Sequence, residues 1–191
     1  MTKPTILAFA GSTRTDSFNK KLVKIAAEGA RDAGADVTVI DLRDFAMPLY
    51  DGDLEQKEGL PSNARKLKDL MLSHKGFLIA SPEYNSSISG VLKNTIDWAS
   101  RQSEGEQPLA CFQGKVAGIM SASPGGLGGL RGLVHVRSIL GNIGIIVTPN
   151  QIAIAKAHES FDADGTLKDK KQEGQVKKIG ADVAALLIKL T

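Results

Sequence analysis

Residues 5–19 read TILAFAGSTRTDSFN, and this stretch decides the class of fold. Its opening part, Thr5 to Ala10, is an apolar run of strand length, which is typical of a strand buried on both faces. Gly11 to Ser17 is rich in hydroxyl side chains, and apolar residues at helical spacing begin at Phe18. The stretch therefore predicts a buried central strand, a polar loop and the start of a helix.

The same alternation of strand and helix continues along the chain. Apolar runs predict strands at residues 5–10, 37–40, 76–80, 116–120 and 144–147. Helical spacing predicts helices at residues 18–33, 62–73, 89–100, 127–140 and 176–190. Longer irregular stretches are expected at residues 45–60, 101–114 and 148–171. This order predicts an α/β protein with a parallel sheet and helices on both faces.

Composition bounds the remaining possibilities. A chain of 191 residues with 42% hydrophobic and 24% charged residues favours a single globular domain over residues 1–191. The net charge of +3 comes from scattered basic residues, which argues against a nucleic-acid partner. No apolar run is long enough to span a bilayer, and Met1 to Pro4 show no secretory signal. With a single cysteine, Cys111, we expect a cytoplasmic protein without membrane association.

The loop after the first strand has the composition of a phosphate site. Ligands of open α/β sheets bind at the carboxyl ends of the strands, and helix N-termini attract anions. Hydroxyls, an amide and the guanidinium of Arg14 add donors between Ser12 and Asn19, as the terminal phosphate of FMN requires. The glycine fingerprints of dinucleotide and P-loop sites are absent here. On this segment alone, an ordinary loop capped by Ser17 is the alternative.

Two further loops end at the same expected edge of the sheet. Residues 81–90, after the third strand, combine the stiff Pro82 with Tyr84 and Asn85, which suit the edge and face of a flat heterocycle. A turn with a partly buried tyrosine is the alternative there. Residues 121–131, after the fourth strand, carry glycines that permit close approach of the backbone to a ring or to another subunit. We expect Trp98 to lie in the core or at a subunit interface.

Other kinds of site have little support. His74, His135 and His158 share no metal-ligand spacing with Cys111, so no metal site is expected. The acidic residues of 161–165 fail the EF-hand spacing, and we expect a turn. Cys111 is expected to be a small buried hydrophobe. The nucleophile elbow of serine hydrolases is missing.

Three motifs in order resemble those of the NAD(P)H-dependent FMN reductase family, which includes soluble quinone, chromate and azo-dye reductases. They are GSTRxxSFN at residues 11–19, PEYNxS with LKNTIDW at 82–98, and SPGGxGGxR at 123–131. The resemblance covers roughly residues 5–147 and continues more loosely through the last helix. It implies a flavodoxin-like three-layer sandwich, with a five-stranded parallel sheet of order 2-1-3-4-5 and non-covalently bound FMN.

The resemblance also implies the residues of the site. The phosphate and its surroundings would be held by Ser12, Arg14, Ser17, Phe18 and Asn19, with Thr15 as a further candidate in the same loop. The isoalloxazine would be bordered by Pro82, Glu83, Tyr84 and Asn85, and Ser121 would close the site. Members are usually homodimers or homotetramers with the site near a subunit interface, so some irregular stretches would be interface.

The implied chemistry is a ping-pong reaction. NADH or NADPH passes a hydride to the flavin N5, and a small-molecule acceptor (a quinone, chromate, an azo dye or free flavin) then takes the electrons. Because the cofactor carries the reaction, no catalytic amino acid is named. A flavodoxin-type electron carrier or an FMN-binding sensor is the alternative, but carriers are typically acidic, and the basic Arg14 argues against one. The acceptor and the choice between NADH and NADPH stay open.

Overall fold

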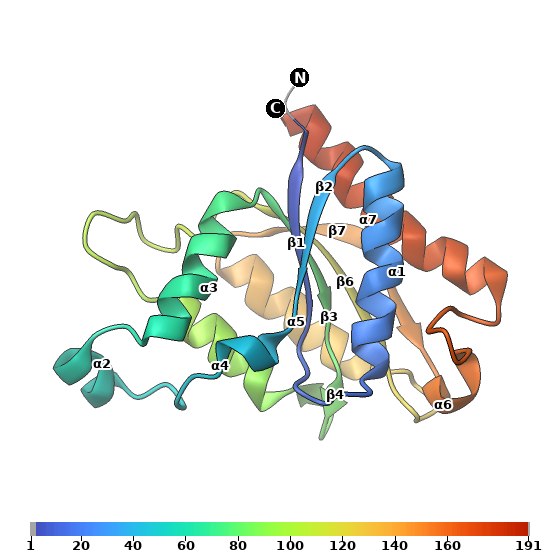
Figure 1. The fold of residues 1–191 in the computed structure, drawn as a ribbon, viewed down its shortest axis with the longest axis horizontal. Helices are drawn as coiled ribbons and strands as arrows, with labels where there is room; N and C mark the ends of the chain where they lie inside the picture. The colour runs from blue at the N-terminus through green and yellow to red at the C-terminus, as the bar shows by residue number, and fades with distance from the viewer. Residues whose placement is uncertain (1–2, 191) are drawn as a thin grey trace.

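The computed structural model describes residues 3–190 as three layers, with one parallel sheet between two layers of helices (Figure 1). The sheet consists of β1 (Thr5–Ala10), β2 (Asp36–Ile40), β3 (Gly76–Ala80), β6 (Val116–Ala122) and β7 (Ile146–Ile154). Its strand order, β2-β1-β3-β6-β7, is the order 2-1-3-4-5 that the resemblance implies. The flavodoxin-like fold is therefore confirmed.

Helices cover both faces of this sheet (Figure 1). On one face lie α1 (Phe18–Asp32) and α7 (Lys170–Leu190), and on the other lie α3 (Ser62–Ser73), α4 (Gly90–Ala99) and α5 (Leu130–Asn142). Shorter elements are η1 (Leu42–Phe45), α2 (Gly52–Glu58), α6 (Ala157–Ser160) and the hairpin of β4 (Glu83–Tyr84) and β5 (Ser87–Ile88). The two-stranded hairpin is not part of the main sheet.

The side chains of β1 alternate between the two hydrophobic clusters. Ile6 and Ala8 pack with α1 and α7, whereas Leu7 and Phe9 pack with α3 to α5. Both sets are buried, as the apolar run predicts. Because helices pack on both faces of β1, the position where the following loop begins is fixed.

The largest departures from the expected elements lie at the C-terminal end. The last strand was expected to stop at Val147, but β7 continues to Ile154 through the polar residues 148–151. β7 is an edge strand, and its pairing with β6 is irregular between Ala117 and Ile119. A strand in this position need not be a continuous apolar run, so the sequence pattern did not indicate its full length. The irregular stretches expected at 45–60 and 148–171 also contain the short helices α2 and α6.

The structure shows where Trp98 and Cys111 lie. Trp98 is fully buried, and its indole Nε1–H donates to the carbonyl of Pro48 at 2.8 Å, so it belongs to the core. Cys111 is buried, and burial raises the pKa of its thiol.

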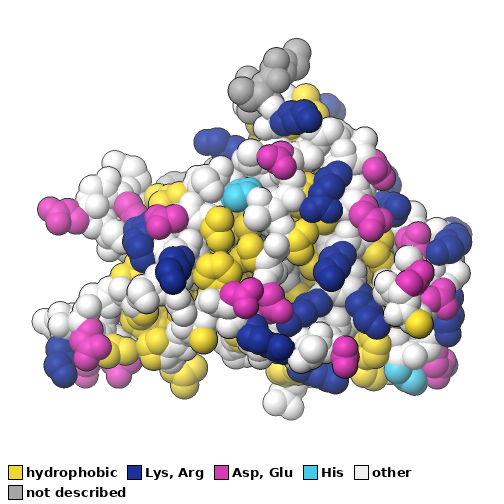
Figure 2. Space-filling model, in the orientation of Figure 1, with side chains coloured by type: hydrophobic (Ala, Val, Ile, Leu, Met, Phe, Trp, Pro, Cys, Tyr) yellow, Lys and Arg dark blue, Asp and Glu magenta, His cyan; other side chains and the backbone are white. Residues whose placement is uncertain are grey.

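Within residues 3–190 no helix is long and apolar enough to cross a membrane. Basic and acidic side chains are interspersed on the face drawn in Figure 2.

Candidate functional site: a cradle at the carboxyl edge of the sheet

One pocket brings together most of the predicted site residues. Because β1, β3 and β6 are neighbours and parallel, their following loops meet at one edge of the sheet. We call this pocket the cradle; it is lined by Ser12, Arg14, Ser17, Phe18, Asn19, Pro82, Glu83, Tyr84, Ala122, Ser123 and Pro124. Of the predicted residues, Thr15, Asn85 and Ser121 are not among those that line it.

The first wall of the cradle is the loop before α1. The N-cap residue of α1 is Ser17, yet its buried hydroxyl makes no capping hydrogen bond. The guanidinium of Arg14 is exposed and has no hydrogen-bond partner within residues 3–190. The first turn of α1 contains no acidic residue, and only from Lys20 onward do its N–H groups donate to an acceptor of the helix, the carbonyl of Ser17. The wall therefore combines free donors with the positive end of a helix.

Asn19 connects this wall to β6. Its amide nitrogen donates to the carbonyl of Ala122 at 2.8 Å, and the N–H of Ala122 donates back to its amide oxygen at 3.0 Å. Both ends of the side-chain amide are thus engaged with a backbone that lies 103 positions away. Asn19 therefore joins two loops of the cradle, and no sequence pattern indicated this partner.

Phe18 is tied in the same way to the C-terminal part of the chain. Its ring stacks on Phe161, with centroids 5.8 Å apart and planes at 18°. Phe161 also pairs with Leu167 in an isolated antiparallel bridge, and the segment between them is the expected turn. The stacked rings therefore connect the start of α1, at the cradle, to the segment before α7.

The second wall is the β4–β5 hairpin, which sequence periodicity did not reveal. Its two-residue loop, Asn85 and Ser86, has φ angles of 51° and 65°, as a tight primed turn requires. Asparagine tolerates this left-handed region better than most residues, which was the one available signal. Tyr84 in the hairpin lines the cradle and is half exposed, whereas Asn85 in the turn does not line it.

Glu83 joins the hairpin to α5. One carboxylate oxygen accepts from the Arg131 guanidinium at 2.7 and 3.0 Å, and the other accepts from the N–H of Gly132 at 3.0 Å. Burial raises the pKa of Glu83, but the hydrogen bonds from Gly132 and Arg131 outweigh it and lower the pKa overall. The ionised carboxylate is therefore committed to the start of α5 and positions Tyr84 indirectly.

Ser121 lies behind the third wall. It is fully buried, and its hydroxyl donates to the carbonyl of Ser81 at 2.6 Å. Two positions later, Ser123 lines the cradle and accepts from the N–H of Gly125 at 3.1 Å. Because β6 ends at Ala122, Ser123 lies in the following loop and no longer shares the orientation of Ser121 in the strand. A Cβ on Gly126 would meet no atom within 4 Å, so the loop is open beside the cradle.

Thr15 faces the other side of the phosphate loop. Its hydroxyl accepts from the Arg43 guanidinium at 3.0 Å, and the same guanidinium donates through Nε to the carbonyl of Thr13 at 3.0 Å. Arg43 belongs to η1, which follows β2, and no motif singled it out. It braces the loop from outside the cradle.

The residues of the cradle fit FMN. A phosphate monoester needs several donors, and the unpaired guanidinium of Arg14 and free hydroxyl of Ser17 stand beside the N-terminus of α1. A flat ring needs an aromatic or stiff backbone border, which Pro82 and Tyr84 supply. Within residues 3–190, no group of His, Cys, Asp and Glu could hold a metal ion.

Comparison with known proteins places this geometry in a family. Residues 4–159 match the family model of the NADPH-dependent FMN reductases. A probable NADPH:quinone oxidoreductase of Oryza sativa subsp. japonica is 34% identical over 190 residues, covering 97% of this chain and 89% of that protein. An NAD(P)H-dependent FMN reductase of Pseudomonas aeruginosa is 35% identical over 167 residues, covering 87% and 85% of the two chains.

A solved structure agrees. The chain superposes on FerB, a flavoenzyme NAD(P)H:(acceptor) oxidoreductase from Paracoccus denitrificans, with a TM-score of 0.80 and 28% identity, over 97% of this chain and 98% of that one. The enzyme interpretation, with FMN and NAD(P)H, therefore holds over the electron-carrier alternative. The chain belongs to the NADPH-dependent FMN reductase family.

Proposed function

We propose that this enzyme uses NAD(P)H to reduce a quinone, with FMN held in the cradle. The observation that carries the proposal is that Arg14 and Ser17 from the loop after β1 and Tyr84 from the β4–β5 hairpin line one pocket. Relatives named as quinone oxidoreductases support the choice of acceptor. Bound FMN would supply the hydride and electron transfer between the nicotinamide and the acceptor, so the protein supplies binding and orientation rather than a nucleophile.

Each wall of the cradle has a distinct part in this proposal. Arg14, Ser12 and Ser17 bind the phosphate, together with the N–H groups at the start of α1. Pro82 and Tyr84 border the ring, and the half-exposed Tyr84 lies where an acceptor enters. Asn19 and Glu83 hold the walls in place through Ala122 and α5.

The reaction is tested by anaerobic mixing of the FMN-loaded protein with NADH or NADPH. We expect the flavin absorbance to bleach and to return on addition of a benzoquinone. If neither nicotinamide bleaches the flavin faster than free FMN is reduced, the proposed activity is wrong.

The cradle is tested by the variant Arg14→Gln. Loss of one charged hydrogen-bond donor to a phosphate costs about 1.5–3 kcal/mol, so FMN affinity should fall about tenfold to a hundredfold. Arg31→Gln is the matched control, because Arg31 lies in the last turn of α1, at the end opposite the phosphate loop. Quenching of flavin fluorescence on binding measures the FMN dissociation constants of both variants. Equal FMN affinities in the two variants would show that Arg14 does not bind the phosphate.

We further propose that a second copy of the chain covers the outer face of α5 and that the protein is a cytoplasmic homodimer or homotetramer of single-domain subunits. Leu130 and Val134 of α5 and Leu127 in the loop before it are 46%, 60% and 52% exposed, and an exposed apolar surface of this kind favours association. The same helix is bonded to Glu83 of the cradle, so the interface would lie beside the site. The lone buried thiol suits a reducing compartment.

Light scattering after size exclusion tests this interface. Val134→Glu should lower the measured mass toward that of a monomer, because a charge in an apolar interface is desolvated without a partner. Leu49→Glu changes another exposed apolar residue, on the segment before α2, and should leave the mass unchanged. If only Leu49→Glu dissociates the protein, the α5 face is not the interface.

A further inference from the structure

The middle of the phosphate loop, residues 11–17, is held by a single residue from another part of the chain. At its start, the N–H of Gly11 donates to a backbone carbonyl at the end of β3 at 2.9 Å, and at its end Ser17 opens α1. Between these two ends, Arg43 is the only residue beyond the loop, within the described part of the chain, that forms hydrogen bonds with residues 12–15. The conformation of this part of the loop therefore depends on one guanidinium.

Two groups of the loop accept from the Arg43 guanidinium. The carbonyl of Thr13 accepts from Nε at 3.0 Å and also from Nη2, and the hydroxyl of Thr15 accepts from Nη2 at 3.0 Å. Because a planar guanidinium presents its donors in a fixed geometry, bonds to both groups set the direction of the Thr13 carbonyl. Thr13 and Arg43 line another pocket, of about 290 Å³, and neither lines the cradle. The carbonyl is thus held toward a residue outside the cradle.

The direction of the Thr13 carbonyl also sets the direction of the next N–H. In a trans peptide unit, the carbonyl oxygen and the following N–H point to opposite sides. The N–H of Arg14 accordingly points away from Arg43 and donates to the hydroxyl oxygen of Ser12 at 3.3 Å. Ser12 is buried and lines the cradle. Because its oxygen accepts this bond, its own O–H proton is left to donate to a ligand there.

The opposite orientation of this peptide unit would oppose the binding of a phosphate. Rotation of the unit would separate the N–H of Arg14 from Ser12 and turn the carbonyl oxygen of Thr13 toward the cradle. A carbonyl oxygen and a phosphate oxygen are both acceptors, so no hydrogen bond could form between them. The bonds from Arg43 to the loop therefore favour the one orientation that offers donors to an anion.

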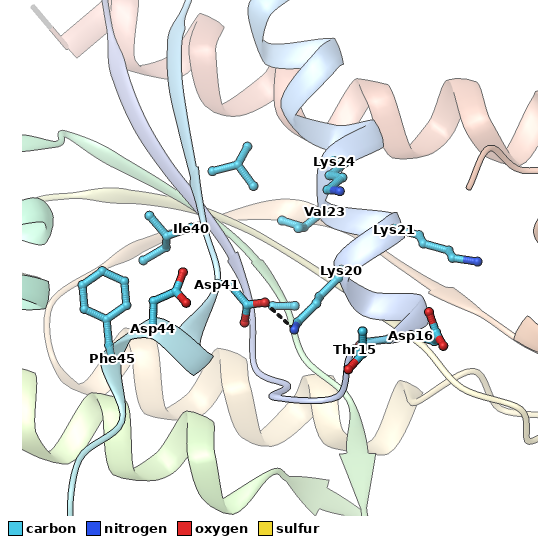
Figure 3. Close-up of a pocket in the computed structure, with 13 residues that line it drawn as sticks. Thr15, Asp16, Lys20, Lys21, Val23, Lys24, Ile40, Asp41, Asp44 and Phe45 are labelled. Atoms are coloured by element: carbon cyan, nitrogen blue, oxygen red, sulfur yellow. Dashed lines mark hydrogen bonds and ion pairs between the residues drawn. The ribbon is translucent and has the colours of Figure 1, made fainter. Parts of the chain in front are cut away.

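Arg43 is itself held between β2 and α1. Asp41 follows β2 as the N-cap residue of η1, and one of its carboxylate oxygens accepts from the backbone N–H of Arg43 at 3.0 Å. The other oxygen is 2.5 Å from the amine of Lys20, and this pair joins η1 to α1 across a pocket of about 590 Å³ that both residues line (Figure 3). Burial raises the pKa of Asp41, but the hydrogen bonds from Lys20 and the Arg43 N–H outweigh it and lower the pKa overall. The ionised carboxylate therefore connects Arg43 to the helix that begins at the cradle.

We propose that Arg43 is a positioning residue for the FMN phosphate. It holds the peptide unit between Thr13 and Arg14 in the orientation that presents the Arg14 N–H and the Ser12 hydroxyl to the phosphate, and it does not contact the flavin itself. The inference rests on the proposed function, since it concerns the cradle in which FMN is placed. It makes the selectivity of the apoprotein for FMN over riboflavin, which lacks the phosphate, depend on Arg43.

Flavin titrations of the protein freed of FMN, followed by fluorescence quenching, test this role. Arg43→Met keeps an apolar stem and removes every donor. We expect its FMN affinity to fall about tenfold, as for the loss of one well-oriented donor, and its riboflavin affinity to stay within about twofold of the wild-type value. Lys66→Met, on the exposed face of α3, removes the same charge and should leave both affinities unchanged. An equal loss for both flavins, or no loss for FMN, would overturn the inference.

The same titrations at high salt separate position from charge. At about 1 M NaCl the Debye length is about 3 Å, so an exposed charge that does not contact the phosphate is screened. The loss of FMN affinity in Arg43→Met, relative to the wild-type protein at the same salt concentration, should persist because it comes from the orientation of a peptide unit. A loss that disappears at high salt would show that Arg43 acts only through its charge, and the inference would be wrong.

Binding also distinguishes this inference from the proposed function, because neither flavin titration requires turnover. If the wild-type protein binds riboflavin as tightly as FMN, the cradle holds no phosphate, and both the placement of FMN and the role of Arg43 are wrong. If the wild-type protein prefers FMN and Arg43→Met keeps the whole preference, only the role of Arg43 is wrong. A selective loss of FMN affinity in a protein that reduces no quinone would contradict the activity alone.

Discussion

At the scale of single residues, Ser89 and Ser17 both stand at the start of a helix, but their hydroxyls have different roles. Ser89 caps α4: its hydroxyl accepts from the N–H of Leu92 at 3.2 Å and donates to the carbonyl of Gly11 at 2.6 Å. Ser17 occupies the N-cap of α1, but its hydroxyl caps nothing and lines the cradle. One hydroxyl stabilises the fold, and the other is kept free for a ligand.

The two serines therefore make opposite predictions when each is replaced by alanine. Ser89→Ala should lower the free energy of unfolding by about 1–2 kcal/mol, because a cap and a buried hydrogen bond are lost. Ser17→Ala should change it by less than about 0.5 kcal/mol in the protein without FMN. The same variant should weaken FMN binding about tenfold. Urea unfolding and fluorescence titration measure the two effects, and a destabilised Ser17→Ala apoprotein would mean that the hydroxyl is structural.

At the scale of elements, the contact between α1 and α7 fixes the direction of α1 and thus the orientation of the cradle. The helices approach so closely that a Cβ on Gly29 would lie 2.0 Å from the carbonyl oxygen of Lys177. A Cβ on Gly180 would lie 1.9 Å from the carbonyl oxygen of Ala26. Glycine is required at both positions because backbone meets backbone there.

A pair of glycine variants in α7 tests this contact. Gly180→Ala must push the helices apart, and we expect it to cost about 3 kcal/mol of unfolding free energy. Gly174→Ala lies in the same helix with no atom within 4 Å of the added Cβ, so it should stabilise by about 0.5–1 kcal/mol through helix propensity. Thermal and urea unfolding distinguish the expected loss of stability in Gly180→Ala from the expected gain in Gly174→Ala. A mild effect of Gly180→Ala would show that the helices separate readily.

At the scale of the whole molecule, a partly buried ion cluster holds the irregular loop of residues 101–114 against α3. The amine of Lys68 is buried and lies 2.6 Å from the carboxylate of Glu106, which also accepts from Arg65 at 2.6 Å. Burial raises the pKa of Glu106, but hydrogen bonds from Lys68, Arg65 and the Ser103 N–H outweigh it and lower the pKa to about 2. The loop is ordered by charge pairing where regular structure is absent.

The cluster predicts a dependence of stability on pH. Because the pKa of Glu106 is lowered in the folded protein, its stabilisation is fully present above about pH 4.5 and is lost as the pH falls toward 2. Glu106→Gln should cost about 3 kcal/mol at pH 7, since Lys68 stays buried without its counter-ion, and the cost should shrink below pH 4.5. Glu58→Gln, on the exposed α2, is the control and should change stability by less than about 0.5 kcal/mol. Urea unfolding at several pH values measures both variants, and a cost independent of pH would contradict the assignment.

The sequence predicts the main elements of the fold well because they depend on neighbouring residues. Apolar runs located the first three strands to within one residue, and helical spacing located α3 at residues 62–73. The β4–β5 hairpin and the part of β7 after Val147 were not predicted, for a related reason. Their residues are polar or few, so no periodicity distinguishes them from loop.

By itself, the sequence determined the alternation of strand and helix, the family motifs and the three loops that meet at one edge of the sheet. Only the tertiary structure decided which partner each of these residues contacts: Asn19 bonds to Ala122, Ser121 to Ser81, and Thr15 to Arg43. The physical reason is that periodic burial is set by residues a few positions apart. Hydrogen-bond partners and pockets are instead set by segments that meet only after the chain has packed.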